Sequence, residues 1–390
     1  MLDGWSTRKL GELADVKTGY PFKSTIYTED ENGIRLLRGD NVTQEGIRWD
    51  GVKRWPALEI QGLEEFHLKV GDLVIAMDRT WVKAGLKVSR ITSNDVPSLL
   101  VQRVARIRAK AGIDQEFLVQ SMNNYQFEQY VKGGQTETAV PHISPGDIKA
   151  FPIRVPPPFE QRRIAKILRT WDEAIENLQA LHAAKRKYYS SILLRLFEAE
   201  YSSHDKLVRA RNIFETVSER ARPDLPLLAV MQDIGIVRRD DLTRRVMMPD
   251  GDTSNYKVVR PGDFVISLRS FEGGLEFSSI TGLVSPAYTV LRPNVEIDGN
   301  YYRHFFKSRS FIGRIDKLIF GIRDGKQIAF RDFGDMLIPL PKIDAQKRQS
   351  SLMSGLEEDL AIETRRIDAI QRQKSGLMQK LLTGEWRASC

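Results

Sequence analysis

The stretch FPIRVP at residues 151–156 returns 185 positions later as MLIPLP at residues 336–341. Upstream, GDLVI at residues 71–75 returns as GDFVI at residues 262–266, at a shift of 191. Similarity that recurs at a nearly fixed spacing indicates an internal duplication, and the small difference in shift indicates loops of unequal length. Each copy has the same order: a mixed segment, a proline-containing strap and a long helical segment.

The two helical segments share one apolar seam. Apolar or aromatic residues recur at alternating steps of three and four, as a coiled-coil seam requires, and the shift of 185 maps one seam onto the other. We therefore predict that the two helices pair with each other; the alternative is two unrelated amphipathic helices, each lying on its own domain. Polar seam residues, His182 with Lys185 and Glu363 with Lys374, either fix the register at a cost in stability or mark a bend or a frayed end. The residues predicted for helix pairing or subunit contact are Ile164, Leu168, Trp171, Ile175, Leu178, Ile192, Leu196, Leu356, Leu360, Ile367, Ile370, Leu377 and Leu381.

The mixed segments, roughly 1–150 and 205–335, predict α+β domains. Short β-branched or apolar runs between Gly, Asp and Pro residues are typical of strands, and they are interleaved with helical patterns without a regular βαβ rhythm. The predicted strands are 73–77, 101–107, 264–268 and 288–291, and the predicted helices are 117–131 and 301–318.

Composition favours a folded chain with an anionic partner. The 390 residues include 59 Lys plus Arg against 51 Asp plus Glu, a formal net charge of +8, which points to a polyanion and to nucleic acid first. An apolar fraction of 41% can build packed cores. Cys390 is the one cysteine, which excludes a disulfide framework and a cysteine-based zinc site. Neither a signal-peptide pattern nor a run of 18 apolar residues occurs, so we expect the protein in the cytoplasm.

Catalytic motifs are missing from the sequence. It contains no Gly-x-x-x-x-Gly-Lys-Ser/Thr loop and no Gly-x-Gly-x-x-Gly after a strand, and its five histidines have no metal-ligand spacing. The segment 155–159 lacks the polar residue that amino-group DNA methyltransferases place before a proline pair. Pro249-Asp250 has no Asp/Glu-x-Lys at a usable distance and is interpreted as a turn. We therefore predict no catalytic and no metal-binding residue in this chain.

Six segments together resemble the specificity subunit of type I restriction-modification systems. The resemblance covers nearly the whole chain and implies two similar target recognition domains, separated by two long helices that pair as an antiparallel coiled coil and bind modification subunits. It predicts recognition domain 1 at 1–155, a central conserved helix at 156–200, recognition domain 2 at 201–341 and a C-terminal conserved helix at 342–390. The second copy departs from the pattern at its entrance and in its strap. The segments that carry the resemblance are LGELA (10–14), TGYPFKS (18–24), the two Gly-Asp strands, PPPFEQ (156–161) and LMQKLLTG (377–384).

The resemblance implies a non-catalytic subunit that binds double-stranded DNA, together with two modification subunits and with restriction subunits. S-adenosylmethionine, Mg and ATP would belong to those partners and not to this chain. A helix over 160–198 would span roughly 58 Å at about 1.5 Å per residue, which suggests a spacer of roughly 17 base pairs between two unlike half-sites. Two alternatives stay open: a diverged, self-sufficient DNA methyltransferase or nuclease, and a coiled-coil assembly scaffold.

Candidate DNA contacts are loops that combine Arg or Lys with aromatic or amide residues. Side chains on base edges read sequence, whereas phosphate contacts only position a protein. For each candidate the alternative is an exposed, merely solvated side chain. The candidates are Lys17, Tyr20, Lys23, Arg79, Trp81, Lys83, Gln135 and His142 in the first copy, and Arg238, Arg239, Arg269, Arg323, Lys326 and Gln327 in the second.

Overall fold

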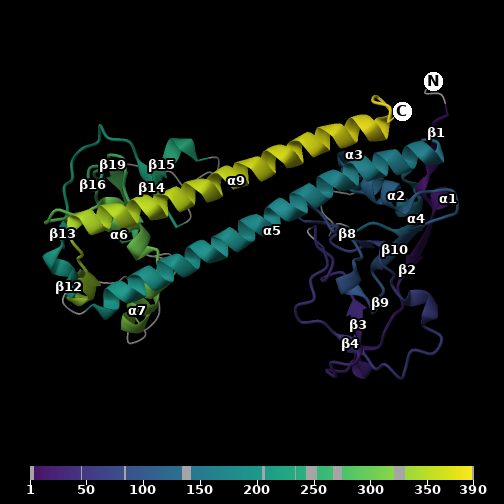
Figure 1. The fold of residues 1–390 in the computed structure, drawn as a ribbon, viewed down its shortest axis with the longest axis horizontal. Helices are drawn as coiled ribbons and strands as arrows, with labels where there is room; N and C mark the ends of the chain where they lie inside the picture. The colour runs from purple at the N-terminus through teal and green to yellow at the C-terminus, as the bar shows by residue number, and fades with distance from the viewer. Residues whose placement is uncertain are drawn as a thin grey trace. The chain divides into compact units, whose positions relative to one another are not determined.

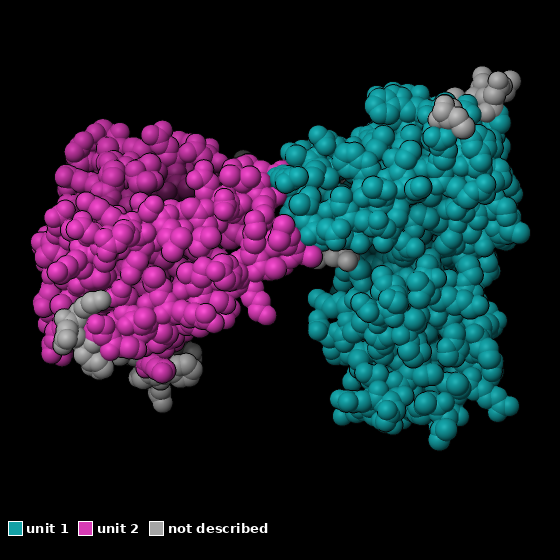
Figure 2. All heavy atoms as spheres, viewed as in Figure 1, with its two compact units in different colours: residues 1–178, 366–390 teal, residues 179–365 magenta. Residues whose placement is uncertain are grey.

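The chain divides into two compact units (Figure 2). Unit 1 comprises Met1–Leu178 together with Arg366–Cys390, and unit 2 is the continuous stretch Gln179–Arg365. Unit 1 is therefore assembled from both ends of the sequence. The computed structural model describes residues 4–44, 46–82, 85–133, 142–203, 207–232, 234–242, 253–266, 275–319 and 330–388.

Two long helices, α5 (Pro158–Ser202) and α9 (Ile343–Thr383), contribute to both units (Figure 1). In unit 1, Lys374 Nζ lies 2.5 Å from Asp172 Oδ1, and in unit 2, Tyr189 Oη donates to Glu357 Oε1 at 3.0 Å. Asp172 precedes Tyr189 on α5 by as many residues as Glu357 precedes Lys374 on α9, so the helices are antiparallel with one register. Within the described residues, no helix has the length and apolar composition that crossing a membrane requires.

Unit 1 is built around a four-stranded antiparallel sheet of order β2-β10-β5-β8. The strand β1 pairs with β11, and a three-stranded sheet of order β4-β3-β9 and the hairpin β6-β7 are added to this frame. The strands are β1 (Ser6–Lys9), β2 (Ala14–Thr18), β3 (Ile34–Leu37), β4 (Arg54–Trp55), β5 (Leu73–Ala76), β6 (Trp81–Val82), β7 (Gly85–Leu86), β8 (Val88–Arg90), β9 (Ser98–Leu100), β10 (Val104–Ala109) and β11 (Pro152–Val155). The short helices are α1 (Leu10–Leu13), α2 (Gln115–Met122), α3 (Tyr125–Gly133) and α4 (Pro145–Ala150).

Unit 2 repeats this frame with a sheet of order β13-β20-β17-β18 and a pair β12-β21. Two two-stranded sheets, β14-β15 and β16-β19, replace the additions of unit 1. The strands are β12 (Leu207–Arg209), β13 (Phe214–Val217), β14 (Leu228–Met231), β15 (Gly235–Arg238), β16 (Lys257–Val259), β17 (Phe264–Ile266), β18 (Glu276–Phe277), β19 (Gly282–Val284), β20 (Thr289–Pro293) and β21 (Leu337–Pro339). The helices are α6 (Gly299–Phe306), α7 (Arg309–Ile319) and α8 (Phe330–Asp335). The predicted fold, a duplicated α+β chain with an antiparallel pair of long helices, is confirmed.

The same ion pair fixes the central strands of both units. In unit 1, Nε and Nη2 of Arg108 on β10 each donate to the buried carboxylate of Asp72 at 2.7 Å. In unit 2, Arg292 on β20 donates to the buried Asp263 at 2.8 and 2.7 Å. The glycine before each aspartate has φ of +91° or +94°, a conformation that costs glycine little. The repeated Gly-Asp motif is therefore the turn and anchor that lead into β5 and β17.

A repeated glutamine ties each long helix to its own unit. Gln161 Oε1 accepts a bond from the backbone N–H of Asp114, and its Nε2 donates to Pro156 O, both at 2.9 Å. Gln346 makes the same two bonds in unit 2, with the aspartate that caps α6 and with the last proline of its strap, at 2.9 and 2.7 Å. Both glutamines are buried, so these bonds satisfy polar groups that would otherwise be costly to bury.

Two expected helices are wrong in the same way in both copies. The segment predicted as one helix over 117–131 is α2 and α3, and that over 301–318 is α6 and α7. At the first break, Asn124 Oδ1 accepts from the N–H of Phe127 at 2.9 Å, and at the second, Ser308 Oγ accepts from the N–H of Phe311 at 3.2 Å. These side chains cap a new helix where apolar periodicity alone predicts continuation.

The expected strands are mostly right to within one or two residues. The strand expected at 73–77 is β5, and that at 288–291 is β20. The one expected at 101–107 begins instead at Val104, because Arg103 has φ of +71° and turns the chain. The one expected at 264–268 is described to Ile266, and its last two residues lie outside the described part. The four segment boundaries inferred from the resemblance stay predictions; α5 begins at Pro158 and α9 at Ile343.

Candidate DNA interface

Arg79 stands on a strained turn that follows β5 of unit 1. Its φ is +48°, a conformation uncommon for a residue with a side chain. The next residue, Thr80, is fully buried, and its Oγ1 donates to Met77 O at 2.9 Å. Because Thr80 fixes the turn, the Arg79 side chain is held exposed at the surface. Strain of this kind is typically retained at functional positions.

The same turn gathers a second candidate, His142. The carboxylate of Asp78 lies 2.6 Å from His142 Nδ1 and 3.6 Å from Arg103 Nε. Asp78 and His142 also form an isolated backbone bridge. Two candidates that are 63 positions apart in sequence are thus brought to one exposed turn, with Arg103 beside them.

The candidates near the chain start are partly engaged within the protein. Lys17 pairs with Glu65 and lies 4.9 Å from the ring centroid of Phe66. Tyr20, which is partly exposed, packs against Phe66 at 5.3 Å between centroids. Lys23 is exposed. Because Glu65 already neutralises Lys17, Lys23 and Tyr20 are the better placed of the three for an external partner.

Trp81 is half-buried against α3. Its Nε1 donates to Glu128 at 3.3 Å, and Lys132 Nζ lies 4.4 Å from the ring centroid. These contacts hold β6 against α3, so the ring has a structural role. In unit 2, Arg238 is exposed at the end of β15, whereas Arg239 Nε donates to Leu228 O at 3.2 Å. The candidates Lys83, Gln135, Arg269, Arg323, Lys326 and Gln327 lie outside the described residues.

A groove of about 670 Å³ beside Arg79 contains basic residues that sequence reasoning missed. Arg48 and Lys87 line it together with Arg79, opposite the carboxylate of Asp40. Burial lowers the pKa of Lys87, and the charges of Arg79 and Arg48 lower it further, whereas Asp40 acts in the other direction. The two missed residues are far apart in sequence, so no single local pattern identified them.

The residues predicted for the helix seam lie inward. All thirteen are buried or half-buried, and none is exposed. Three polar seam residues form ion pairs between the helices: Lys185 with Glu363 in unit 2, and Lys374 with Asp172 in unit 1. His182 Nδ1 lies 3.8 Å from the same Glu363. The polar seam positions are thus charge pairs across the helices, which favours the register interpretation.

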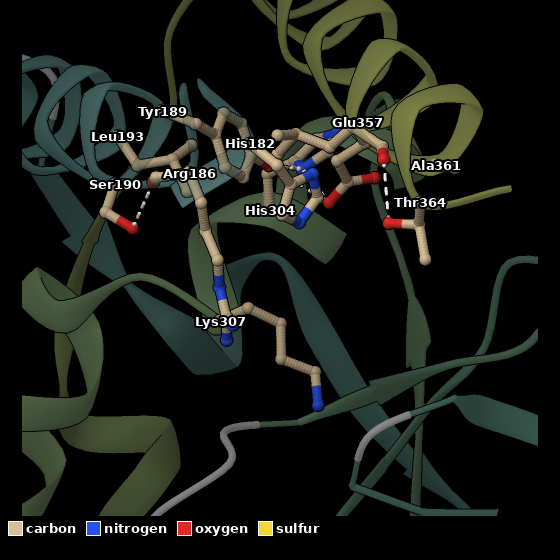
Figure 3. Close-up of a pocket in the computed structure, with 11 residues that line it drawn as sticks. His182, Arg186, Tyr189, Ser190, Leu193, His304, Lys307, Glu357, Ala361 and Thr364 are labelled. Atoms are coloured by element: carbon tan, nitrogen blue, oxygen red, sulfur yellow. Dashed lines mark hydrogen bonds and ion pairs between the residues drawn. The ribbon is translucent and has the colours of Figure 1, made fainter. Parts of the chain in front are cut away.

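A buried polar cluster joins α6 to both long helices in unit 2 (Figure 3). His304 on α6 is almost fully buried; its Nδ1 lies 3.1 Å from Tyr189 Oη and 3.3 Å from Glu357 Oε1. Arg303 Nη2 donates to Glu357 at 2.7 Å. Burial acts to raise the pKa of Glu357, but the bonds and charges of His304 and Arg303 outweigh it and lower the pKa to about 2. Burial and Glu357 together raise the pKa of Tyr189.

Unit 1 has an equivalent cluster built from other residues. Gln120 on α2 donates to Asp172 on α5 at 2.7 Å, and Lys374 on α9 bonds the other oxygen of Asp172. Gln120 and His304 each lie six residues after the aspartate that caps their helix, and the shift of 185 maps Asp172 onto Glu357. In each unit a central carboxylate therefore joins a recognition-segment helix to the helix pair. No group of three or more His, Cys, Asp or Glu that could hold a metal occurs among the described residues.

Part of the sequence is similar to known DNA specificity proteins. Residues 2–185 match the family described as "Type I restriction modification DNA specificity domain". The chain is 33% identical over 180 residues to the type I restriction enzyme EcoAI specificity subunit of Escherichia coli, and 29% identical over 196 residues to the MjaVIII specificity subunit of Methanocaldococcus jannaschii. These matches cover 46% and 49% of this chain, and the chain spans only 30% and 46% of those relatives.

Three matches extend over nearly the whole chain at lower identity. The putative MjaX specificity subunit of M. jannaschii is 19% identical, with 99% of this chain and 94% of that protein covered. The solved type I restriction-modification S subunit from M. genitalium is 17% identical with a TM-score of 0.55, covering 97% of this chain and 96% of its own. A further solved chain from a study of type I system assembly gives a TM-score of 0.58 at 17% identity, with 97% and 98% covered. At this identity the two structures establish the fold alone.

Proposed function

Because residues 2–185 match the type I restriction modification DNA specificity domain, we propose that this chain is a specificity subunit that selects the DNA sequence on which such a system acts. Each recognition segment reads one half of an asymmetric, bipartite site in double-stranded DNA. The two long helices set the number of unread base pairs between the halves.

The duplicated frame with unlike additions carries the proposal. The sheet order, the Asp-Arg pair and the glutamine tie recur in both units. What is added to the frame differs: a three-stranded sheet and the β6-β7 hairpin in unit 1, and the β14-β15 and β16-β19 pairs in unit 2. Two different reading surfaces on one repeated support suit two half-sites of different sequence. The exposed, strained Arg79 turn is the best-defined reader in unit 1.

The subunit acts without catalytic residues of its own in this proposal. Two modification subunits carry methyl transfer with S-adenosylmethionine, and restriction subunits carry ATP- and Mg-dependent cleavage. All of them meet the target through this chain, in the cytoplasm. The formal charge of +8 is modest for 390 residues, which supports DNA binding that is shared between this chain and its partner chains.

Co-expression with the methyltransferase encoded beside it, followed by single-molecule sequencing of methylated sites, tests the proposal. The expected result is one bipartite motif with two different halves and a fixed gap. A single continuous short motif would contradict the two-reader arrangement. Methylation or cleavage by the purified chain alone would favour the self-sufficient enzyme, and binding that does not depend on salt would favour a scaffold with no DNA role.

A further inference from the structure

The groove beside Arg79 concentrates positive charge within one recognition segment. Its described lining residues include three cations, Arg48, Arg79 and Lys87, and one carboxylate, Asp40. Asp40 is itself engaged by Arg38, whose Nη2 donates to it at 2.8 Å. Arg48 has a carboxylate near it only at 3.8 Å, in a pair that is largely exposed and contributes little. The groove therefore carries more positive charge than its own acids neutralise.

The loop that bears Arg48 is held in place by buried bonds. Asn41 is buried, and its Oδ1 accepts from the backbone N–H of Arg38 at 2.9 Å, while its Nδ2 donates to Arg48 O at 2.9 Å. The backbone N–H of Arg48 in turn donates to Asn41 O at 2.8 Å. Ser89 Oγ donates to Gly46 O at 3.1 Å and joins the loop to β8. Because these bonds hold its backbone, Arg48 loses little freedom when it engages a ligand.

Lys87 lies deeper than the two arginines. It is half-buried between β7 and β8, and its Nζ donates to Gly39 O. Like charges from Arg48 and Arg79 oppose its protonation, as burial does. An ammonium group kept in such surroundings is destabilised in the free protein, and an incoming anion relieves that cost. The chemistry fits a phosphate, which Lys engages as a compact point charge.

We propose that this groove holds one strand of the DNA duplex, with Lys87 and Arg48 on backbone phosphates and Arg79 directed at base edges from its strained turn. This inference rests on the proposed function and assigns two roles within one groove, phosphate contact and base recognition. Lys87 and Arg48 supply sequence-independent grip, whereas Arg79 supplies discrimination.

The salt dependence of DNA binding distinguishes phosphate contact from base recognition. The full chain, with its modification subunit, is titrated against a random-sequence duplex of about 40 base pairs over a series of NaCl concentrations. The variants are Lys87→Met, Arg48→Met and their double, which keep the aliphatic stems. Lys149→Met is the matched control, because this lysine on α4 is exposed and does not line the groove. Tryptophan fluorescence of each variant verifies folding.

Each groove variant is expected to reduce the slope of log K against log salt by about 0.9, and the double by about twice that, with the control unchanged. Arg79→Ala is expected to leave the slope nearly intact and to relax the methylated motif at one position by about tenfold or more. Wild-type slopes in both groove variants would overturn the groove assignment while leaving the proposed function in place. A wild-type complex without salt-dependent binding would overturn both. Arg48 is exposed, so its variant decides the matter even if Lys87→Met fails to fold.

Discussion

Arg387→Ala is expected to destabilise unit 1 by leaving a buried carboxylate without its main partner. Glu160, in the first turn of α5, is 1% exposed. It accepts bonds from Arg387 Nε at 2.8 Å and Nη2 at 3.0 Å, and from Trp5 Nε1 at 3.1 Å. Arg387 and Trp5 therefore both contact the carboxylate of Glu160 in the first turn of α5.

The expected loss follows from the burial of the two partners. Removing one partner of a buried ion pair costs about 3–5 kcal/mol, because the other charge stays buried and uncompensated. The Arg387 side chain is 35% exposed, so solvent weakens its attraction to Glu160. We therefore expect the lower end of the range, a loss of about 3 kcal/mol in the free energy of unfolding. The double variant Glu160→Gln with Arg387→Ala buries a neutral amide and should recover more than half of that loss.

Tryptophan fluorescence in urea measures this effect in unit 1 alone. The six tryptophans, at positions 5, 49, 55, 81, 171 and 386, all belong to unit 1, so unfolding of unit 2 contributes little to the signal. Arg162→Ala, at an exposed position on the same helix, is the control and should change stability by less than about 0.5 kcal/mol. The reasoning is refuted if Arg387→Ala costs less than about 1 kcal/mol, or if the double variant is less stable than the single.

Three further predictions concern the repeated frame. Gln161→Leu and Gln346→Leu should each destabilise their own unit by about 1–3 kcal/mol, because a strap carbonyl and a backbone N–H lose their partner; equal protection from hydrogen exchange in variant and wild type would contradict this. Asn124→Ala and Ser308→Ala should each cost about 1 kcal/mol through loss of a helix cap, measured by thermal unfolding, and an unchanged midpoint in both would refute the capping role. Glu357 has its pKa lowered from 4.5 to about 2 in the folded chain, so its contribution to stability is complete above pH 4.5 and is lost as pH falls towards 2. Tyrosine near-UV circular dichroism should follow that loss in wild type and show a flatter profile in Glu357→Gln.

Much of the fold was predictable from the internal repeat, because short motifs that recur in both copies mark the same turns and strands. The Gly-Asp turns and the strap before each long helix are short contiguous motifs, and each marks the same element in both units. The helix breaks were missed because Asn124 and Ser308 are single polar residues inside an apolar pattern, and only tertiary packing decides that they cap a new turn.

The candidate DNA contacts were predictable from the sequence only where a single loop contributes them. Arg79 follows a recognisable strand and turn, and the structure leaves it exposed. Arg48 and Lys87 come from separate segments that meet through the loop held by Asn41 and through β8, so their proximity is a property of the fold. The aromatic Trp81 had the composition of a DNA contact but is packed against α3.

The discontinuous assembly of unit 1 has a consequence for synthesis on the ribosome. Unit 2 is one continuous stretch and can close as soon as its residues emerge. Unit 1 needs Arg366–Cys390, including the Arg387 that neutralises Glu160, so its N-terminal segment stays incomplete until those residues have emerged. The segment that is synthesised first therefore completes its folding after unit 2, and a chain truncated before Arg366 would carry all of unit 2 but an incomplete unit 1.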